Sequence, residues 1–187
     1  MRILLAGATG VLGRATLPHL DGHHVVGLTR TREKLRLLEA LGVDGVVCDA
    51  YDAEALLRVA RQARPELIVN FLTDLSSGPG EANNRVRREA GTNLVTAAVA
   101  TGSRRLVVES VAFPLERAAA EAVDLMEKTA REAPLEVLIL RFGRLWGPGT
   151  WYREPPDPPA IEIDDAGARA ASLIISGPAG VHVIAET

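Results

Sequence analysis

Cysteine is almost absent from the 187-residue chain, which contains only Cys48. A single cysteine excludes an internal disulfide and fits a reducing, cytoplasmic environment. One cysteine and four scattered histidines also cannot supply the cluster of ligands that a zinc ion needs. The composition therefore predicts neither a disulfide framework nor a metal site.

Aromatic side chains, positive charge and long apolar runs are scarce as well. Aromatic residues make up 4% of the chain and its formal net charge is −3, so it lacks the basic, aromatic surface that binds nucleic acid. The apolar run at the N-terminus is too short for a signal peptide. No apolar stretch approaches the roughly 18 residues of a membrane span. We expect no nucleic-acid partner and no membrane partner.

The chain does have a regular alternation of two patterns. Short, continuously apolar runs alternate with amphipathic stretches, which is typical of a parallel sheet covered by helices on both faces. We therefore expect one domain over residues 1–187, with an α/β, doubly wound parallel sheet, that is, a Rossmann fold. The expected strands are 3–6, 25–28, 46–48, 67–71, 106–108 and 137–140. The expected helices are 11–20, 32–41, 53–63, 82–101 and 115–132.

A glycine-rich turn follows the first expected strand. The sequence AGATGVLGRATL places Gly7, Gly10 and Gly13 between that strand and the first helix. In a dinucleotide-binding turn, one glycine permits the sharp turn, one lets the backbone approach the pyrophosphate, and one lets helix and strand pack closely. The N-terminus of the helix adds free N–H groups and a positive dipole. This motif in this position predicts a dinucleotide cofactor.

The end of the second strand indicates which dinucleotide is preferred. Chains that bind NAD place an acid there to hydrogen-bond the ribose hydroxyls. This chain has Thr29 and Arg30 instead, and no acid occurs before Glu33. An arginine and a hydroxyl accept a 2′-phosphate, which a carboxylate would repel. We expect NADP(H) to be favoured over NAD(H); the alternative is that Arg30 is a solvated surface residue.

The same topology places the remaining contacts with the cofactor. Asp49 ends the third strand, where it should meet the adenine edge, and the turn after the fourth strand should pass under the nicotinamide ribose. The expected cofactor-binding residues are Gly7, Thr9, Gly10, Val11, Leu12, Gly13, Thr29, Arg30, Asp49, Ala50, Asn70, Phe71 and Leu72.

Several segments together resemble one family. GATGVLG is similar to the glycine loop, VVCDAYD to the adenine-contact segment, and LRFGRLWGPG and IEIDDAGARAASLII to later segments of extended or atypical short-chain dehydrogenases/reductases of the NAD-dependent epimerase/dehydratase family. The resemblance implies about seven strands, with the last at 181–185. It also implies a minimal C-terminal substrate region, because the family's insert is cut to the proline-rich loop at 147–160.

The proton relay of that family is the feature that this chain lacks. The family uses Tyr-x-x-x-Lys on the helix after the fifth strand, with a Ser or Thr at the end of that strand. The resemblance places Phe113 at the tyrosine and Arg117 at the lysine, on one helical face. The Ser/Thr position falls near Val111, with Ser110 one residue away. Phenylalanine has no proton to transfer, and Arg117 would serve only to hold the ribose or a phosphate.

Two classes of function fit these observations. One is an NADP(H)-binding protein with a degraded catalytic motif, acting as a sensor, a binding module or an inactive paralogue. The other is an NAD(P)-dependent oxidoreductase or epimerase, acting on a small carbonyl or sugar-like substrate through a substitute proton relay. Nothing in the sequence favours a third class, a non-redox lyase or isomerase. Side chains expected near the strand ends are Asp74, Ser76, Ser77, Glu109, Ser110 and Tyr152.

Glu109 is the most interesting of these side chains. A carboxylate that ends a buried strand can have a raised pKa and serve as an acid or a base. The alternative is an ordinary carboxylate on the surface or at the N-terminus of a helix.

The family resemblance also implies a homodimer. Helices corresponding to 82–101 and 115–132 build a four-helix interface in the family. The second stretch carries small and apolar residues suited to close packing, namely Leu115, Ala118, Ala119, Ala122, Val123 and Met126. We expect a homodimer through these helices, although three arginines crowd the start of the first.

Overall fold

Seven parallel strands form the central sheet of the computed structural model, which describes residues 1–75 and 80–186. Their order is β3-β2-β1-β4-β5-β6-β9. The expected doubly wound α/β sheet is therefore confirmed, together with its seven strands. The strands are β1 (Arg2–Ala6), β2 (His24–Thr29), β3 (Asp44–Val47), β4 (Leu67–Asn70), β5 (Arg105–Val111), β6 (Glu136–Phe142) and β9 (Gly180–Ile184).

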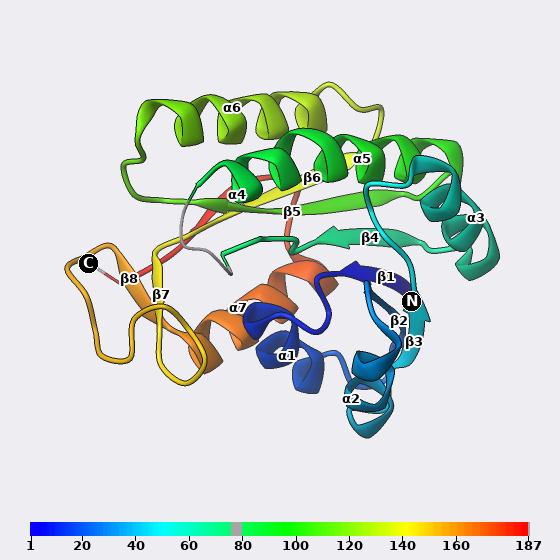
Figure 1. Cartoon of the computed structure of the whole chain (residues 1–187), viewed down its shortest axis with the longest axis horizontal. Helices are drawn as coiled ribbons and strands as arrows, with labels where there is room; N and C mark the ends of the chain where they lie inside the picture. The colour runs from blue at the N-terminus through cyan, green and yellow to red at the C-terminus, as the bar shows by residue number, and fades with distance from the viewer. Residues whose placement is uncertain (76–79, 187) are drawn as a thin grey trace.

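Helices cover both faces of this sheet (Figure 1). One layer contains α1 (Val11–Thr16), η1 (Leu17–His19), η2 (Arg32–Lys34), α2 (Leu35–Ala40) and α7 (Ile163–Ser176). The other contains α3 (Ala53–Ala63), α4 (Glu81–Arg85), η3 (Val86–Ala90), α5 (Gly91–Ala100) and α6 (Arg117–Arg131).

Each helix layer has its own apolar core. Successive residues of a strand point to opposite faces, so Leu5 belongs to the core under α1 and α7, whereas Leu4 belongs to the core under α3, α5 and α6. Both faces are buried, which is why the strands are continuously apolar in sequence.

The helix boundaries follow local chemistry. Asp52 begins α3 as expected, because its Oδ1 accepts a hydrogen bond from the Ala55 amide at 2.9 Å. The predicted helix at 82–101 is a continuous run of α4, η3 and α5, in which η3 is π-helical. The helix predicted from residue 115 begins only at Arg117. Pro114 disfavours helical backbone in the residue before it, and Glu116 is still extended, so Phe113 precedes the helix.

A second, two-stranded sheet was not expected from the sequence. Its strands are β7 (Arg144–Trp146) and β8 (Ala160–Glu162), which run parallel and bracket the proline-rich loop. Glu162 then caps α7, with its Oε2 accepting from the amides of Asp164 at 2.6 Å and Asp165 at 3.3 Å. Across residues 1–75 and 80–186, no helix is long and apolar enough to cross a membrane.

Candidate functional site

The sheet order creates a crevice at the carboxyl ends of β1 and β4. These two strands are neighbours, but the chain continues from β1 toward β2 and β3, and from β4 toward β5 and β6. Connections that leave in opposite directions open a crevice at this switch point, where ligands of α/β sheets bind.

The glycine turn lies in this crevice and has no room for side chains. Gly7 has φ +86°, and a Cβ on it would lie 2.4 Å from the carbonyl oxygen of Phe71. A Cβ on Gly13 would lie 2.3 Å from the carbonyl oxygen of Gly7. The first contact brings the turn against the end of β4, and the second packs α1 against the turn. Both glycines therefore serve close backbone packing, as the sequence predicts.

The N-terminus of α1 presents free amides to the same crevice. Gly10 is the N-cap and offers no side-chain cap, and the first turn contains no acidic residue. The amides of Val11, Leu12 and Gly13 precede the first intrahelical hydrogen bond, which Arg14 donates to Gly10 at 3.0 Å. Thr9 lies half-buried in the turn. A turn of this construction suits a pyrophosphate.

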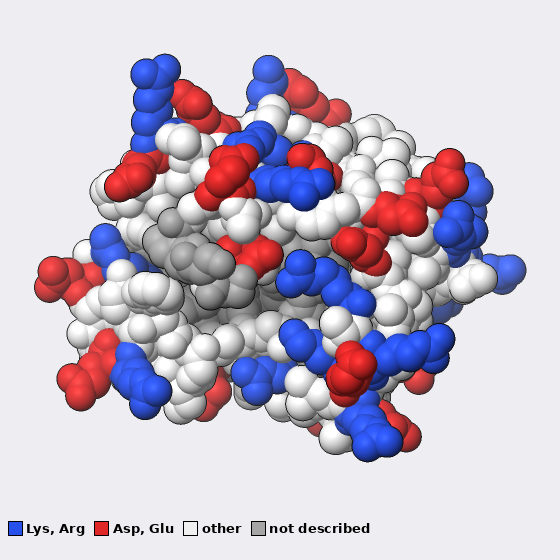
Figure 2. Space-filling model, viewed as in Figure 1, with Lys and Arg blue, Asp and Glu red and all other residues white. Residues whose placement is uncertain are grey.

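The end of β2 lies at the side of the crevice where the sequence analysis expects the adenosine. The Thr29 side chain is buried, and its hydroxyl lies 3.4 Å from the carbonyl oxygen of Thr31. Arg30 is 59% exposed, with its guanidinium 3.7 Å from the Asp74 carboxylate. Figure 2 shows Lys and Arg side chains gathered beside the central hollow of this face. The exposed basic residues of α1, η2, α2 and the end of β2 are Arg14, Arg30, Arg32, Lys34 and Arg36.

A second turn completes the adenosine side. Asp49 is exposed after β3, and its Oδ1 accepts a hydrogen bond from the Tyr51 amide at 3.0 Å. Ala50 is buried, and Asn93 of α5 donates to its carbonyl oxygen at 2.9 Å. The turn is thus fixed from both ends beside the end of β2.

The end of β4 lies where the sequence analysis expects the nicotinamide. Asn70 is buried, and its Oδ1 accepts a hydrogen bond from the Leu72 amide at 3.1 Å. Phe71 is buried with its ring edge-on to Phe142, the ring centroids being 6.3 Å apart. Leu72 is half-buried. The turn therefore has a fixed conformation directly against Gly7.

The expectation that Phe113 and Arg117 share a helical face is wrong. Phe113 lies in the loop before α6, half-buried, with the Arg144 guanidinium 4.8 Å from its ring centroid. Arg117 is the first residue of α6, and its side chain is 93% exposed and paired with Glu121 at 2.8 Å. The sequence alignment therefore brought together two residues that the structure separates.

A buried polar cluster at the ends of β5 and β6 was missed from the sequence. The Glu127 carboxylate of α6 accepts hydrogen bonds from Ser110 at 2.6 Å, from Arg141 at 2.9 and 2.7 Å, and from Arg131 at 2.7 Å. Burial alone would raise the pKa of Glu127, but the hydrogen bonds from Arg141 and Ser110 lower it below its usual value. A charged residue on the apolar stripe of α6, between Val123 and Ala130, was the signal for this cluster.

Glu109 is buried rather than solvated. It is 8% exposed, and burial raises the pKa of its carboxyl group, against the opposing charge of Arg87. The Arg87 guanidinium, also buried, lies 3.9 Å away. The expected direction of the Glu109 pKa shift is confirmed, and its partner on η3 was not foreseen.

The other candidates for a proton relay are placed less centrally. Tyr152 is 38% exposed in the proline-rich loop, and its carbonyl oxygen accepts from the Gly147 amide at 2.8 Å. The Asp74 amide donates to Asn83 Oδ1 at 3.0 Å, and its carboxylate faces Arg30. Ser76 and Ser77 lie outside the described residues.

Comparison with known proteins places the chain in a family. Residues 7–150 match the model of a family described as NAD(P)H-binding. The chain belongs to this NAD(P)H-binding family. A curated relative from Streptomyces, a 3-diazoavenalumate denitrifying reductase, is 39% identical over 182 residues. That alignment covers 81% of this chain but only 59% of the relative.

Solved structures share the fold of this NAD(P)H-binding chain. WbmH from Bordetella bronchiseptica, solved with NAD⁺, has a TM-score of 0.80 at 15% identity and covers 98% of this chain and 75% of its own. The UDP-glucose 4-epimerase of Thermus thermophilus, solved with NAD, has a TM-score of 0.79 at 19% identity, covering 99% and 78%. The expected resemblance to epimerase/dehydratase-type proteins is confirmed at the level of the fold.

The glycine turn has the geometry that a dinucleotide pyrophosphate needs. A pyrophosphate requires a close backbone approach and free N–H donors. The turn offers the first at Gly7 and Gly13, and the second at the uncapped N-terminus of α1. No group of three or more His, Cys, Asp or Glu in residues 1–75 and 80–186 is arranged to hold a metal ion.

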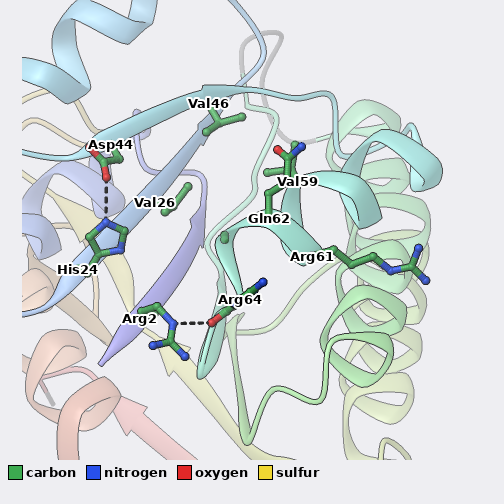
Figure 3. A pocket seen from close by; sticks show the side chains of 10 residues that line it. Arg2, His24, Val26, Asp44, Val46, Val59, Arg61, Gln62 and Arg64 are labelled. Carbon is green, nitrogen blue, oxygen red and sulfur yellow. Dashed lines mark hydrogen bonds and ion pairs between the residues drawn. The ribbon is translucent and has the colours of Figure 1, made fainter.

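A hollow of about 900 Å³ elsewhere on the molecule is not part of this site (Figure 3). It is lined by Arg2 and His24, the first residues of β1 and β2, and by residues at the end of α3. His24 pairs there with Asp44 at 2.9 Å. These are the amino ends of the strands, opposite to the glycine turn, so the hollow cannot hold the nicotinamide of the same cofactor.

Proposed function

We propose that the protein is an NADP(H)-dependent reductase that works without the Tyr–Lys proton relay of its structural relatives. The proposal rests on the side chains that α6 presents toward the carboxyl end of the sheet. Glu127 contacts Ser110 at the end of β5, so this turn of α6 is level with the strand end. One and two turns earlier on the same face lie Val123 and Ala119.

These two positions are where a relay of the family's type would stand. Val123 is buried and Ala119 is half-buried, and neither side chain can donate or accept a proton. We infer that the relay is missing from Ala119 and Val123, rather than replaced at Phe113 and Arg117. The glycine turn beside this face keeps every feature that cofactor binding needs.

A substrate that takes up hydride alone can be reduced without a relay. When bound, NAD(P)H supplies a hydride. A carbonyl group that accepts a hydride also needs a proton on its oxygen. A diazonium carbon needs none, since the new C–H bond replaces the C–N bond, and N₂ leaves with the electron pair of that bond. The Streptomyces relative is named as a denitrifying reductase of a diazo compound. We propose the same substrate class for this chain.

The preference for NADP(H) is part of the proposal. No acid follows Thr29 before Glu33, and Arg30 and Arg32 are exposed beside the end of β2. A 2′-phosphate can therefore pair with a guanidinium there without meeting a ribose-binding carboxylate. Asp74 lies 3.7 Å from Arg30, so the phosphate has to compete with this carboxylate.

A substrate panel tests the proposed activity. The protein is mixed with NADPH and, in turn, with an aryl diazonium salt, benzaldehyde and UDP-glucose, each beside a control without protein. We expect saturable NADPH oxidation and N₂ release with the diazonium salt only. Tight NADPH binding without any turnover would instead favour the binding-module interpretation. Reduction of benzaldehyde that is lost in Glu109→Gln would favour a substitute relay.

We propose two further features of the chain. The chain forms one domain over residues 1–187, and it forms a homodimer through the helices at 82–101 and 115–132. Ala122, Val123 and Met126 are buried within the chain itself and are not available to a partner. Exposed apolar side chains on the same helices, Val99 at 42% and Leu125 at 45%, support a dimer surface instead.

A further inference from the structure

Arg87 is an unusual arginine because its guanidinium is buried without a full set of partners. The residue is 4% exposed, and its Nε has no hydrogen-bond partner among the described residues. Its nearest carboxylate oxygen belongs to Glu109, at 3.9 Å from one terminal nitrogen. That distance is too long for a hydrogen bond, although it is short enough for strong attraction. A buried, charged donor left without a partner lowers the stability of the fold.

The pair lies at the edge of the crevice, where β5 extends past the end of β4. The pairing of β4 with β5 ends at Asn70 and Val108, so Glu109 is the first residue of β5 beyond the end of β4. Its register partner on β6 is Leu140, which belongs to the core under α1 and α7. Arg87 comes from the opposite helix layer, so the pair bridges the two sides of the sheet where β4 has stopped.

The helix that carries Arg87 is distorted at this residue. Arg87 belongs to η3, a π-helical segment inside an otherwise α-helical run. Segments of this kind are uncommon and occur frequently at functional sites, because the wider turn redirects a side chain. Gly91, one turn later, faces Asn70 and Met126, which places this side of the helix toward the end of β4 and α6.

The charges of the pair suit an anion. Arg87 supplies a guanidinium cation whose N–H groups can only donate hydrogen bonds. Burial raises the pKa of Glu109, so a proton is taken up there more readily than by an exposed carboxylate. Three other elements pack near Glu109. Strand β6 contributes the apolar Leu140 and β4 the neutral Asn70. Helix α6 contributes Glu127, whose carboxylate accepts hydrogen bonds from Ser110 and Arg141. Arg87 is thus the charged group that acts on Glu109.

We propose that Arg87 and Glu109 form a carboxylate-binding site for the substrate beside the nicotinamide side of the crevice. The free Nε–H and a terminal N–H of Arg87 donate to the two oxygens of the carboxylate, in the forked geometry that arginine offers. Glu109 takes up one proton as the anion binds, so that one positive and one negative charge remain. This proposal rests on the proposed function only in that the crevice receives a small-molecule substrate.

Calorimetry with benzoate as the probe tests the site in the NADP⁺-saturated protein. Titrations in two buffers of different ionisation enthalpy report the protons taken up per benzoate. We expect saturable binding with uptake of up to one proton and an affinity that falls as the pH rises. Arg87→Met should weaken benzoate binding about ten-fold or more, as expected for a hydrogen bond to a charged group. Glu109→Gln should keep the binding and abolish the proton uptake.

Matched controls separate this site from the cofactor and from unfolding. Arg88→Met alters the adjacent arginine, which pairs with Glu81 and should leave benzoate binding unchanged. If Arg87→Met does not fold, the same benzoate titrations on Arg87→Lys and Glu109→Gln test the proposal. Loss of NADPH affinity in Arg87→Lys would assign the arginine to the cofactor and overturn the proposal.

The outcome for the site is independent of the reductase activity. The proposal would also be overturned if the unmodified protein did not bind benzoate. The same holds if benzoate bound without proton uptake and Glu109→Gln did not change that binding. Because benzoate binding requires no turnover, the site can stand if no diazo compound is reduced. Conversely, if the protein reduces a diazo compound and Arg87→Met leaves the KM for that compound unaltered, the proposed carboxylate site is wrong while the proposed reductase activity stands.

Discussion

Two buried glutamates, less than twenty residues apart in sequence, have opposite electrostatic environments. Glu127 accepts hydrogen bonds from two arginines and a serine, and these lower its pKa although it is buried. Glu109 has one arginine at 3.9 Å, and burial raises its pKa. The difference lies in the number and distance of donors, because both carboxylates are removed from water. Ionised Glu127 therefore stabilises the fold, whereas ionised Glu109 lowers the free energy of unfolding.

The two glutamates should affect stability with opposite dependence on pH. The contribution of Glu127 is present above the usual glutamate pKa of 4.5 and is lost as the pH falls. The unfavourable contribution of Glu109 is absent below that value and grows as the pH rises. At pH 7 we expect Glu127→Gln to lower the free energy of unfolding by about 3 kcal/mol. Glu109→Gln should raise it.

Urea denaturation at pH 4 and pH 7 measures both effects. At the lower pH, Glu109→Gln should approach the unmodified protein, and the difference caused by Glu127→Gln should begin to shrink. Equal shifts of the same sign at both pH values would contradict this description of the two carboxylates.

The proposed preference for NADP(H) depends on Arg30. Arg30→Ala removes the guanidinium expected to bind the 2′-phosphate, so the affinity for NADPH should fall about ten-fold while that for NADH changes little. Isothermal titration with both cofactors measures the ratio, and Arg36→Ala on α2 is the control. NADH binding as tightly as NADPH to the unmodified protein would show that Arg30 does not select the cofactor.

At the scale of elements, the sequence predicted the sheet and the glycine turn well. Continuous apolar runs mark strands that are buried on both faces, and the spacing of Gly7, Gly10 and Gly13 reports backbone contacts that Cβ atoms would block. Both signals are local. The start of α6 was placed two residues early, because the alanine-rich pattern does not show where the turn after Pro114 ends.

Polar contacts between elements could not be predicted in the same way. The pairing of Arg87 with Glu109 joins η3 to β5, and that of Glu127 with Arg141 joins α6 to β6. Such pairs depend on the packing of helices over strand ends, which no spacing in one sequence encodes. The helical face expected to hold both Phe113 and Arg117 failed for a local reason instead, because α6 begins only at Arg117.

The packing of α1 against the glycine turn gives a direct test at this scale. A Cβ at Gly13 would lie 2.3 Å from the Gly7 carbonyl oxygen and 2.9 Å from the Ala8 Cα, both backbone atoms that cannot rotate away. Gly13→Ala should displace α1 and lower NADPH affinity by at least about ten-fold. Gly80→Ala is the matched control, since no described atom lies within 4 Å of its Cβ. Unchanged NADPH binding by Gly13→Ala, measured by titration, would contradict the assigned cradle.

At the scale of the whole molecule, the oligomeric state remains a prediction. The outer face of α6 presents the charged residues Arg117, Glu121 and Lys128 together with exposed Leu125. A shallow hollow of about 350 Å³ lies beside it, between α5 and α6, and includes Val99. A dimer over this surface should be weakened by Leu125→Glu. Light scattering at micromolar concentration should give the mass of two chains, and a monomer before mutation would rule the dimer out.

The central claim is that this fold delivers hydride to a substrate without a proton from the protein. The most direct measurement follows the label from NADPH that carries deuterium at its transferring position, in a reaction with an aryl diazonium salt, beside a second reaction with unlabelled NADPH in D₂O. Mass spectrometry of the arene should find one deuterium from labelled NADPH and none from the solvent. Deuterium taken from D₂O, or an arene that forms at the same rate without the protein, would contradict the account.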